Sequence, residues 1–457
     1  MEREQAVMQP ERINGGLRAG KVAALAFVLV SLGACSVLGG GGDKKPKTPV
    51  FGNRVSILSS ESGAEVDSAL ASMPVVLPEA VVNTEWSQPG GNSAKLIGHV
   101  ALAAAPVEVW STTISGSTSR ARLAAAPVIA GGKLYVIDAD ARVIAFDAKT
   151  GARSWSTQMP SEGNGRSLFG GGVSVLEGRL YVATGVGDVG ALDAATGTVL
   201  WKKRPGGPLR GSPTLANGHV YVMSQDNQVF ALDQQTGETQ WSDAGTAQAT
   251  GVFGVAAPAA AQGTVIAGFS SGELTAYRYE NGRDLWGDAL SRTNISTSVA
   301  ALTDIDADPV IDRGRVFAIG QGGRMASYEL VSGQRLWEIN VAGISTPAVV
   351  DEWVFVVTDD ARLLCIARTT GKIRWISQLK RWEDAKDKKG AVRWTGPVAA
   401  GGRLILVSTD GDLVYVNPAD GAVAISKDMG HRMTLSPVVA DNMLYILADD
   451  GRLTAYR

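Results

Sequence analysis

The stretch ALDAATGTVLW, residues 191–201, decides the fold, because versions of it recur along the chain from residue 107 onward. The clearest copies place Thr-Gly after an aspartate and then, four residues beyond the glycine, Trp155, Trp201 or Trp241. Looser copies keep the glycine and the large apolar residue. The anchors stand at positions 110, 155, 201, 241, 286, 337, 375 and 425. A period near 45 residues, built from short strands, is typical of one four-stranded blade of a β-propeller.

Each repeat divides into four expected strands. A proline opens the first strand in seven repeats, where its missing N–H costs no bond, and Gly172 takes this place in the eighth. A glycine-containing turn then leads to an alternating apolar run such as residues 134–137, and a second polar turn leads to the third strand. The Thr-Gly hairpin leads to the outermost strand, which carries the tryptophan. The opening prolines are Pro127, Pro213, Pro258, Pro309, Pro347, Pro397 and Pro437.

The repeated tryptophans are best explained by packing. An indole buries a large apolar face between neighbouring blades, while its N–H bonds a backbone acceptor. A cofactor role for all of them is implausible, because they would ring the outside of the disc.

The two ends of the repeat region complement each other. Residues 433–457 supply three strands without a tryptophan-bearing fourth, and residues 107–114 are a tryptophan-bearing strand with nothing before it. Pairing them removes two exposed edges. The sequence therefore predicts an all-β, eight-bladed propeller of four-stranded antiparallel blades over residues 107–457, closed by the strand at 107–114.

The first 106 residues have a different character. Four basic residues within positions 1–21 precede an apolar run at 22–32, which is too short to span a membrane but suits a signal peptide at 1–34. Leu32-Gly33-Ala34-Cys35 resembles a bacterial lipobox, which implies lipidation of Cys35; an ordinary signal peptide with an incidental Cys35 is the alternative. Residues 35–49 are expected to form a flexible tether, and residues 50–106 an irregular arm lying across the propeller.

Composition excludes several classes of function. The chain has 457 residues, 45% of them hydrophobic, and a net charge of −2, so no global positive field attracts nucleic acid. Two cysteines and three histidines are too few for a Cys/His metal cluster. No phosphate-binding glycine loop opens a helix. We therefore expect no metal and no nucleotide cofactor.

The repeats at 107–457 resemble those of quinoprotein-like (PQQ-type) propellers, a fold with several functions. A quinone-dependent dehydrogenase is one reading, but such enzymes carry a vicinal disulfide and calcium ligands that cannot be placed here. A carbohydrate-binding lipoprotein is another, because Trp353, Trp382 and Trp394 lie outside the anchor positions and could stack on a ligand.

A lipobox followed by this eight-bladed repeat is most similar to the BamB family, the lipoproteins of the outer-membrane β-barrel assembly complex. The resemblance implies a non-catalytic scaffold without cofactor. Such a scaffold is lipid-anchored to the outer membrane on its periplasmic face. It binds the POTRA domains of a BamA-like protein, meets other assembly lipoproteins, and assists insertion of unfolded outer-membrane proteins.

The resemblance also points to a partner surface on two consecutive connections between blades, residues 242–257 and 287–308. Asp304 and Asp306 match the acidic pair of the family. The Leu-x-Leu-Arg stretch of the family falls on residues 250–253, where Val252 keeps the apolar character and Phe253 replaces the arginine. We expect the carboxylates to pair with basic residues of the partner, with Val252 and Phe253 in apolar contact beside them. Capping of a local turn is the alternative role for these aspartates.

Overall fold

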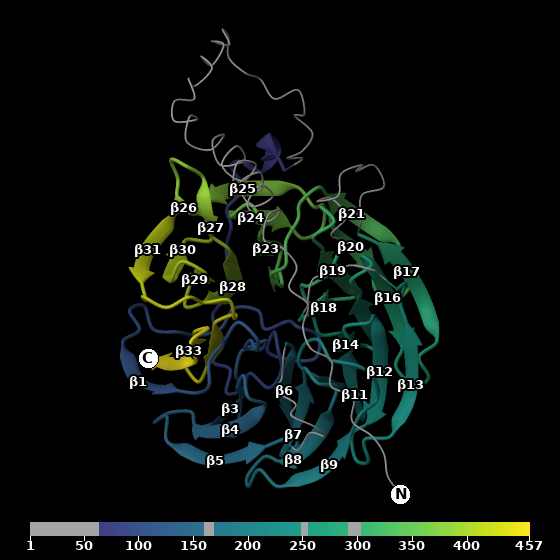
Figure 1. Cartoon of the computed structure of the whole chain (residues 1–457). Coiled ribbons are helices and arrows are strands. Elements are labelled where there is room, and N and C mark those ends of the chain that lie inside the picture. Colours follow the sequence, from purple (N-terminus) through teal and green to yellow (C-terminus); the bar gives the residue numbers. More distant parts are fainter. Residues whose placement is uncertain (1–63, 160–168, 248–254, 291–302) are drawn as a thin grey trace, which may run out of the picture. The chain divides into compact units, whose positions relative to one another are not determined.

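The computed structural model describes residues 64–159, 169–247, 255–290 and 303–457. In these segments, four-stranded antiparallel sheets follow one another around a ring, with the first strand of each innermost (Figure 1). Eight such blades are present in the described part of the chain, so the predicted eight-bladed propeller is confirmed.

The strands have the following bounds. Blade 1 contains β2 (Val128–Ala130), β3 (Lys133–Ile137), β4 (Arg142–Asp147) and β5 (Arg153–Gln158); blade 2 contains β6 (Gly171–Leu176), β7 (Arg179–Thr184), β8 (Val189–Asp193) and β9 (Val199–Lys203). Blade 3 contains β10 (Thr214–Ala216), β11 (His219–Met223), β12 (Gln228–Asp233) and β13 (Thr239–Ala244); blade 4 contains β14 (Ala259–Ala261), β15 (Thr264–Gly268), β16 (Glu273–Arg278) and β17 (Asp284–Ala289). Blade 5 contains β18 (Val310–Asp312), β19 (Arg315–Ile319), β20 (Met325–Glu329) and β21 (Arg335–Ile339); blade 6 contains β22 (Ala348–Val350), β23 (Trp353–Val357), β24 (Arg362–Ala367) and β25 (Ile373–Gln378). Blade 7 contains β28 (Trp394–Ala400), β29 (Arg403–Ser408), β30 (Asp412–Val416) and β31 (Val423–Asp428).

Blade 8 joins the two ends of the repeat region. Its inner strands are β32 (Val438–Ala440), β33 (Met443–Leu447) and β34 (Arg452–Tyr456), and its outermost strand is β1 (Glu108–Thr113). Beyond the paired strands, the N–H of Val107 donates to the carbonyl of Arg457 at 2.9 Å, and the reverse bond measures 2.8 Å. The predicted closure of the ring is therefore confirmed.

The tryptophan on each outermost strand of blades 1 to 6, and Trp110 on β1, packs against the glycine hairpin of the following blade. The indole N–H of Trp201, for example, donates to the carbonyl of Gln234 at 3.1 Å. A Cβ placed on Gly237 would lie 2.5 Å from the same ring, so this position requires glycine. At seven of the eight junctions between blades, one tryptophan, one carbonyl and one glycine thus join a blade to the next. The other indole bonds run from Trp110 to Ala148, Trp155 to Ala194, Trp241 to Tyr279, Trp286 to Leu330, Trp337 to Arg368 and Trp375 to Pro418.

Residues 64–106 form an extended arm that begins with the short 3-10 turn η1 (Ser68–Leu70). The arm pairs with the inner edges of the blades: Trp86 and Ile129 exchange backbone bonds of 2.8 and 2.9 Å. The side chain of Gln88 bonds both the N–H and the carbonyl of Leu215 in β10. Further backbone bonds to the arm come from Val175 to Ser87, Ala260 to Ser93, Ile311 to Ala94 and Asp441 to Asn83, and Val100 donates to Ala399. The arm therefore touches the innermost strand, or the turn that follows it, in blades 1 to 5, 7 and 8.

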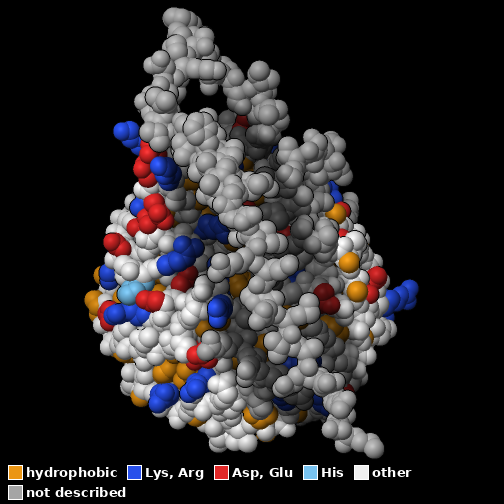
Figure 2. Space-filling view, viewed as in Figure 1, with side chains coloured by type: hydrophobic (Ala, Val, Ile, Leu, Met, Phe, Trp, Pro, Cys, Tyr) orange, Lys and Arg blue, Asp and Glu red, His pale blue; other side chains and the backbone are white. Residues whose placement is uncertain are grey.

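The two faces of the ring differ in their connections. The first and third hairpins of each blade lie on one face; the second turn and the connection to the next blade lie on the other, which we call the connection face. The charged segment after β25 contains a short hairpin of β26 (Trp382–Asp384) and β27 (Lys389–Ala391). Figure 2 shows Lys and Arg side chains intermixed with Asp and Glu over blades 7 and 8. Among the described residues, no helix has the length and apolar character needed to cross a membrane.

Candidate functional site

The predicted acidic pair lies in the connection that leads into β18. Asp304 is 1% exposed and Asp306 is 8% exposed, so both side chains lie inside the ring rather than on its surface. Val252 and Phe253 lie outside the described residues, as does Cys35. The structure therefore places two of the four predicted partner-binding residues, and it places them in the interior.

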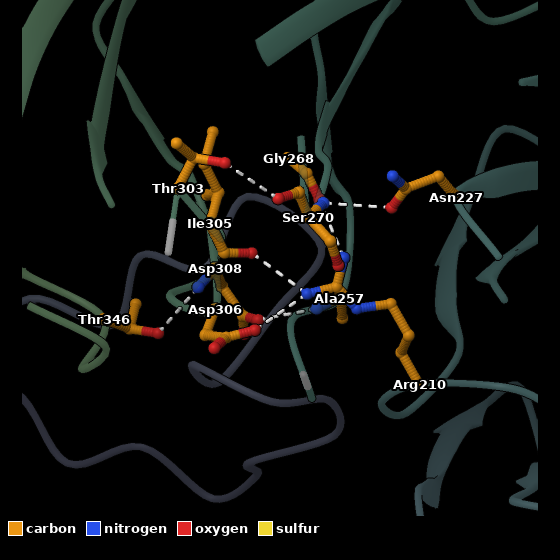
Figure 3. A network of polar contacts seen from close by, with 10 residues as sticks. All are labelled: Arg210, Asn227, Ala257, Gly268, Ser270, Thr303, Ile305, Asp306, Asp308 and Thr346. Atoms are coloured by element: carbon orange, nitrogen blue, oxygen red, sulfur yellow. Dashed lines mark hydrogen bonds and ion pairs between the residues drawn. The ribbon is translucent and has the colours of Figure 1, made fainter. Parts of the chain in front are cut away.

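Arg210 explains how a buried carboxylate is accommodated there. Its guanidinium is fully buried and donates from Nη2 to Asp306 Oδ1 at 2.8 Å and to the carbonyl of Ile305 at 3.1 Å (Figure 3). Nη1 donates to the carbonyl of Gly268 at 3.4 Å. Because Arg210 precedes β10, Gly268 ends β15 and Asp306 precedes β18, a single side chain ties together blades 3, 4 and 5.

Asp308 continues this network into blade 6. Its Oδ1 accepts from the N–H of Ala257 at 2.7 Å, and its own N–H donates to Thr346 Oγ1 at 3.1 Å. On the other side, Thr303 donates to the carbonyl of Ser270 at 3.1 Å, and the N–H of Ser270 donates to Asn227 at 2.9 Å. We call these ten residues the connection network: Arg210, Asn227, Ala257, Gly268, Ser270, Thr303, Ile305, Asp306, Asp308 and Thr346 (Figure 3).

Close approach of the backbone supports the same arrangement. A Cβ on Gly211 would lie 1.9 Å from the carbonyl oxygen of Val255, so the connection that follows Arg210 can pack on the connection before β14 only with glycine at this position. The side chain of Val255 itself remains 37% exposed. The network therefore fixes the bases of consecutive connections and leaves an apolar side chain at the surface between them.

Burial dominates the electrostatics of the network. Burial raises the pKa of Asp306 to about 6, although the neighbouring Arg210 favours the charged form. Burial also raises the pKa of Asp308, opposed by Lys95 of the arm, and lowers the pKa of Lys95 to about 8. Inside the ring, the positive charges of Arg210 and Lys95 thus offset the two carboxylates.

These contacts engage the carboxylate of Asp306 within its own chain. Asp306 pairs with Arg210 of its own chain, so its carboxylate is not held out toward a partner's basic residue. Sequence reasoning missed Arg210, although the segment Pro208-Leu209-Arg210-Gly211 stands directly before the opening Pro213.

Other candidate chemistry is not assembled in the described part of the chain. There, no group of three or more His, Cys, Asp or Glu side chains is close enough to hold a metal ion. Cys365 is a free thiol within β24, fully buried, and burial raises its pKa. Of the three tryptophans considered as candidates for stacking on a ligand, Trp353 belongs to the core, Trp382 lies on the β26–β27 hairpin, and Trp394 lines a cavity inside the ring.

Comparison with known proteins gives a consistent result. The family model described as outer membrane protein assembly factor BamB matches residues 100–168, 161–377 and 379–457. The protein of that name from Escherichia coli K12 is 31% identical over 351 residues, covering 76% of this chain and 87% of its own length. The one from Xanthomonas campestris pv. campestris is 31% identical over 355 residues, covering 77% of this chain and 85% of its own length.

Solved structures share the fold at lower identity. The crystal structure of BamB from Moraxella catarrhalis has a TM-score of 0.66 at 20% identity and covers 77% of this chain and 100% of its own. A quinohemoprotein alcohol dehydrogenase from Comamonas testosteroni has a TM-score of 0.64 at 15% identity, covering 82% of this chain and 81% of its own. At such identities, the two structural matches support the fold alone.

Proposed function

Because the chain belongs to the BamB family of outer membrane protein assembly factors, we propose that it is a non-catalytic scaffold in the assembly of outer-membrane proteins. It acts at the outer membrane, on the periplasmic face, held by a lipid on Cys35. Its principal partner is the POTRA region of a BamA-like barrel protein, together with other lipoproteins of the assembly complex. Unfolded outer-membrane proteins are further candidates for contact.

The observation that carries this proposal is the connection network beneath the predicted partner surface. Arg210, Asp306 and Asp308 hold the connections of blades 3 to 6 in one arrangement, which spares the ordering cost that mobile loops would pay on binding. In this proposal Val252 and Phe253 contact the partner. Asp304 and Asp306 are buried beneath the same surface, and Asp306 acts by holding the shape of its connection.

The direct test is co-purification of the full-length lipoprotein with the assembly protein from detergent-solubilised outer membranes. Val255→Asp places a charge on the connection face, where the valine is 37% exposed, and should reduce recovery of the partner strongly. Val331→Asp is the matched control, because Val331 is 73% exposed on the hairpin between β20 and β21, on the opposite face. Equal recovery with both folded variants would contradict a partner surface on the connection face.

A second comparison separates shape from charge at the acidic pair. In the double variant Arg210→Met/Asp306→Leu, apolar side chains replace a buried ion pair, an exchange that folds often tolerate. A folded double variant that still binds the partner supports a positioning role for Asp306. One that is folded and fails to bind indicates that the carboxylate itself is recognised.

The quinone-dependent dehydrogenase reading is tested separately. The protein is reconstituted with pyrroloquinoline quinone and calcium and assayed for dye-linked oxidation of alcohols and sugars. We expect no turnover above a heat-killed control, and turnover would contradict the scaffold as the sole function.

A further inference from the structure

The ring encloses a cavity of about 360 Å³ between the arm and the bases of the connections. The arm supplies one end, with Trp86, Pro89, Lys95 and Ile97 among the lining residues. The walls come from the segments around the opening prolines of several blades. A cavity of this size, closed at one end by the chain's own arm, falls within the range of small-molecule sites.

Two residues that line this cavity each carry a buried polar atom with no hydrogen-bond partner among the described residues. The atoms are Ser212 Oγ and Gln321 Oε1. Ser212 is 3% exposed and stands directly before Pro213, close to Arg210. Because buried polar atoms in proteins are nearly always satisfied, these two atoms point to an occupant that can both donate and accept hydrogen bonds.

A buried cation from the arm lies on the same side of the cavity. Lys95 is 3% exposed, and its ammonium donates to Thr214 Oγ1 at 3.0 Å. That hydroxyl in turn donates to the carbonyl of Pro258 at 2.6 Å. An ammonium has three N–H donors, so Lys95 can also serve a ligand in the cavity that it lines.

The remaining wall is apolar. Pro347, Pro397, Pro437 and Leu435 line it together with Trp394. The indole N–H of Trp394 donates to the carbonyl of Lys380 at 2.8 Å, so its polar edge is already satisfied and its ring is left for apolar contact. One polar wall and one apolar wall suit a ligand with hydroxyl groups on one side and C–H groups on the other.

The charged residues of the lining favour an anion. The basic ones are Lys95, Arg122, Arg393 and Arg432, and the acidic ones are Asp306 and Asp308. Asp306 is already paired with Arg210, which further reduces the negative charge presented to the cavity. Arg432 is likewise paired with Asp449, at 3.1 Å. With both pairs set aside, Lys95, Arg122 and Arg393 still outnumber Asp308 around the cavity.

We propose that this cavity is a binding site for a small hydroxylated anion, of the chemical class of a sugar acid. The arginines and Lys95 attract its carboxylate, Ser212 and Gln321 bond its hydroxyls, and Trp394 with the prolines covers its apolar face. Its lining includes Val255 and Asp306, so the site adjoins the partner surface, and it adds a ligand-dependent property to the scaffold.

The test uses D-glucuronate as the probe and D-glucose as the neutral comparison, with the full-length protein. Glucuronate should raise the melting temperature in a concentration-dependent way and should shift NMR signals of the indole of Trp394. Glucose should bind more weakly, because it lacks the carboxylate. Absence of any effect of glucuronate at tens of millimolar, or indistinguishable binding of the two probes, would overturn the proposal.

The variant Gln321→Leu tests whether glucuronate binds in this cavity. Replacing an unsatisfied buried amide by an apolar group of similar size should leave the free protein as stable as wild type, or more stable, while glucuronate binding weakens by about three- to tenfold. A purely structural role for Gln321 cannot produce this combination. Unchanged affinity in the folded variant would overturn the assignment.

Arg393→Gln provides a second, milder variant, because Arg393 is exposed and its loss does not endanger the core. This variant should weaken the affinity for glucuronate by about threefold and leave the affinity for glucose unchanged. Equal weakening of both probes would contradict recognition of the carboxylate at this side of the cavity.

Discussion

Replacing Gln88 by methionine tests whether the arm is an integral part of the propeller. Gln88 is 3% exposed, and its side chain imitates a neighbouring strand. Its Nε2 donates to the carbonyl of Leu215 at 3.0 Å, and its Oε1 accepts from the N–H of Leu215 at 2.8 Å. A single side chain thus satisfies both backbone groups at the inner edge of β10.

The expected cost follows from what Gln88→Met leaves behind. Methionine keeps the length and apolar volume of the side chain, so the cavity contribution stays small. The N–H and the carbonyl of Leu215 lose their buried partner, at about 1–3 kcal/mol for each group. We therefore expect the free energy of unfolding to fall by about 2–6 kcal/mol, which is a large share of the total stability of a typical domain.

Gln158→Met is the matched control. The Nε2 of Gln158 donates to the carbonyl of Asp140 at 2.9 Å, but this contact is exposed and water can replace it. The free energy of unfolding of this control variant should fall by no more than about 1 kcal/mol. Urea unfolding of both variants, followed by tryptophan fluorescence, measures the difference. Equal stabilities for the two variants would refute the view that the arm completes the inner edges of the blades.

Deleting residues 452–457 removes β34, which leaves β1 without a partner strand and exposes one edge of β33, so the truncated protein should aggregate or melt far below the full-length protein in a thermal scan; unchanged melting would contradict ring closure. Gly282→Ala should destabilise by about 1–3 kcal/mol more than Gly314→Ala, because both glycines have positive φ but only a Cβ at position 282 meets the indole of Trp241, at 2.6 Å. Because the folded pKa of Asp306, about 6, lies above its unfolded value, its protonation contributes stability that is fully present below about pH 4 and lost as the pH rises through 6. Urea unfolding should therefore show that the free energy of unfolding of the wild type, relative to that of Asp306→Asn, rises by about 1.4 kcal/mol from pH 7.5 to pH 5. Parallel pH profiles for the two proteins would contradict this role of Asp306.

The propeller could be predicted because its stabilising contacts repeat with the sequence. Each tryptophan packs on a glycine hairpin one blade ahead, so the same residue types recur at the same spacing. The one irregular anchor has a structural explanation. The third and fourth strands of blade 8, β34 and β1, are not joined by a hairpin, so Ile425 of blade 7 has no glycine turn to pack on and is 47% exposed.

The path of the arm could not be predicted to the same degree, because most of its contacts are made by backbone atoms. The carbonyls of Ser93 and Ala94 accept from the N–H groups of Ala260 and Ile311, and neither bond depends on the side chain. Such pairing leaves no periodic pattern in the sequence. Within residues 64–106, the buried polar side chains are those of Gln88, Lys95 and His99, and burial is not visible before the fold is known.

The pairing of Arg210 with Asp306 escaped prediction for a geometric reason. The two residues are 96 positions apart, in connections of blades that are not adjacent, and a long guanidinium can join them because these connections converge toward the inside of the ring. Comparing equivalent positions in successive repeats therefore finds neighbouring connections, but not this contact across a blade. It follows that loss of partner binding in Asp306→Lys would not by itself identify a contact residue, because the substitution places two positive charges together inside the ring. The exposed Val255 and the double variant of Arg210 and Asp306 separate recognition from folding, which charge reversal of the acidic pair cannot do.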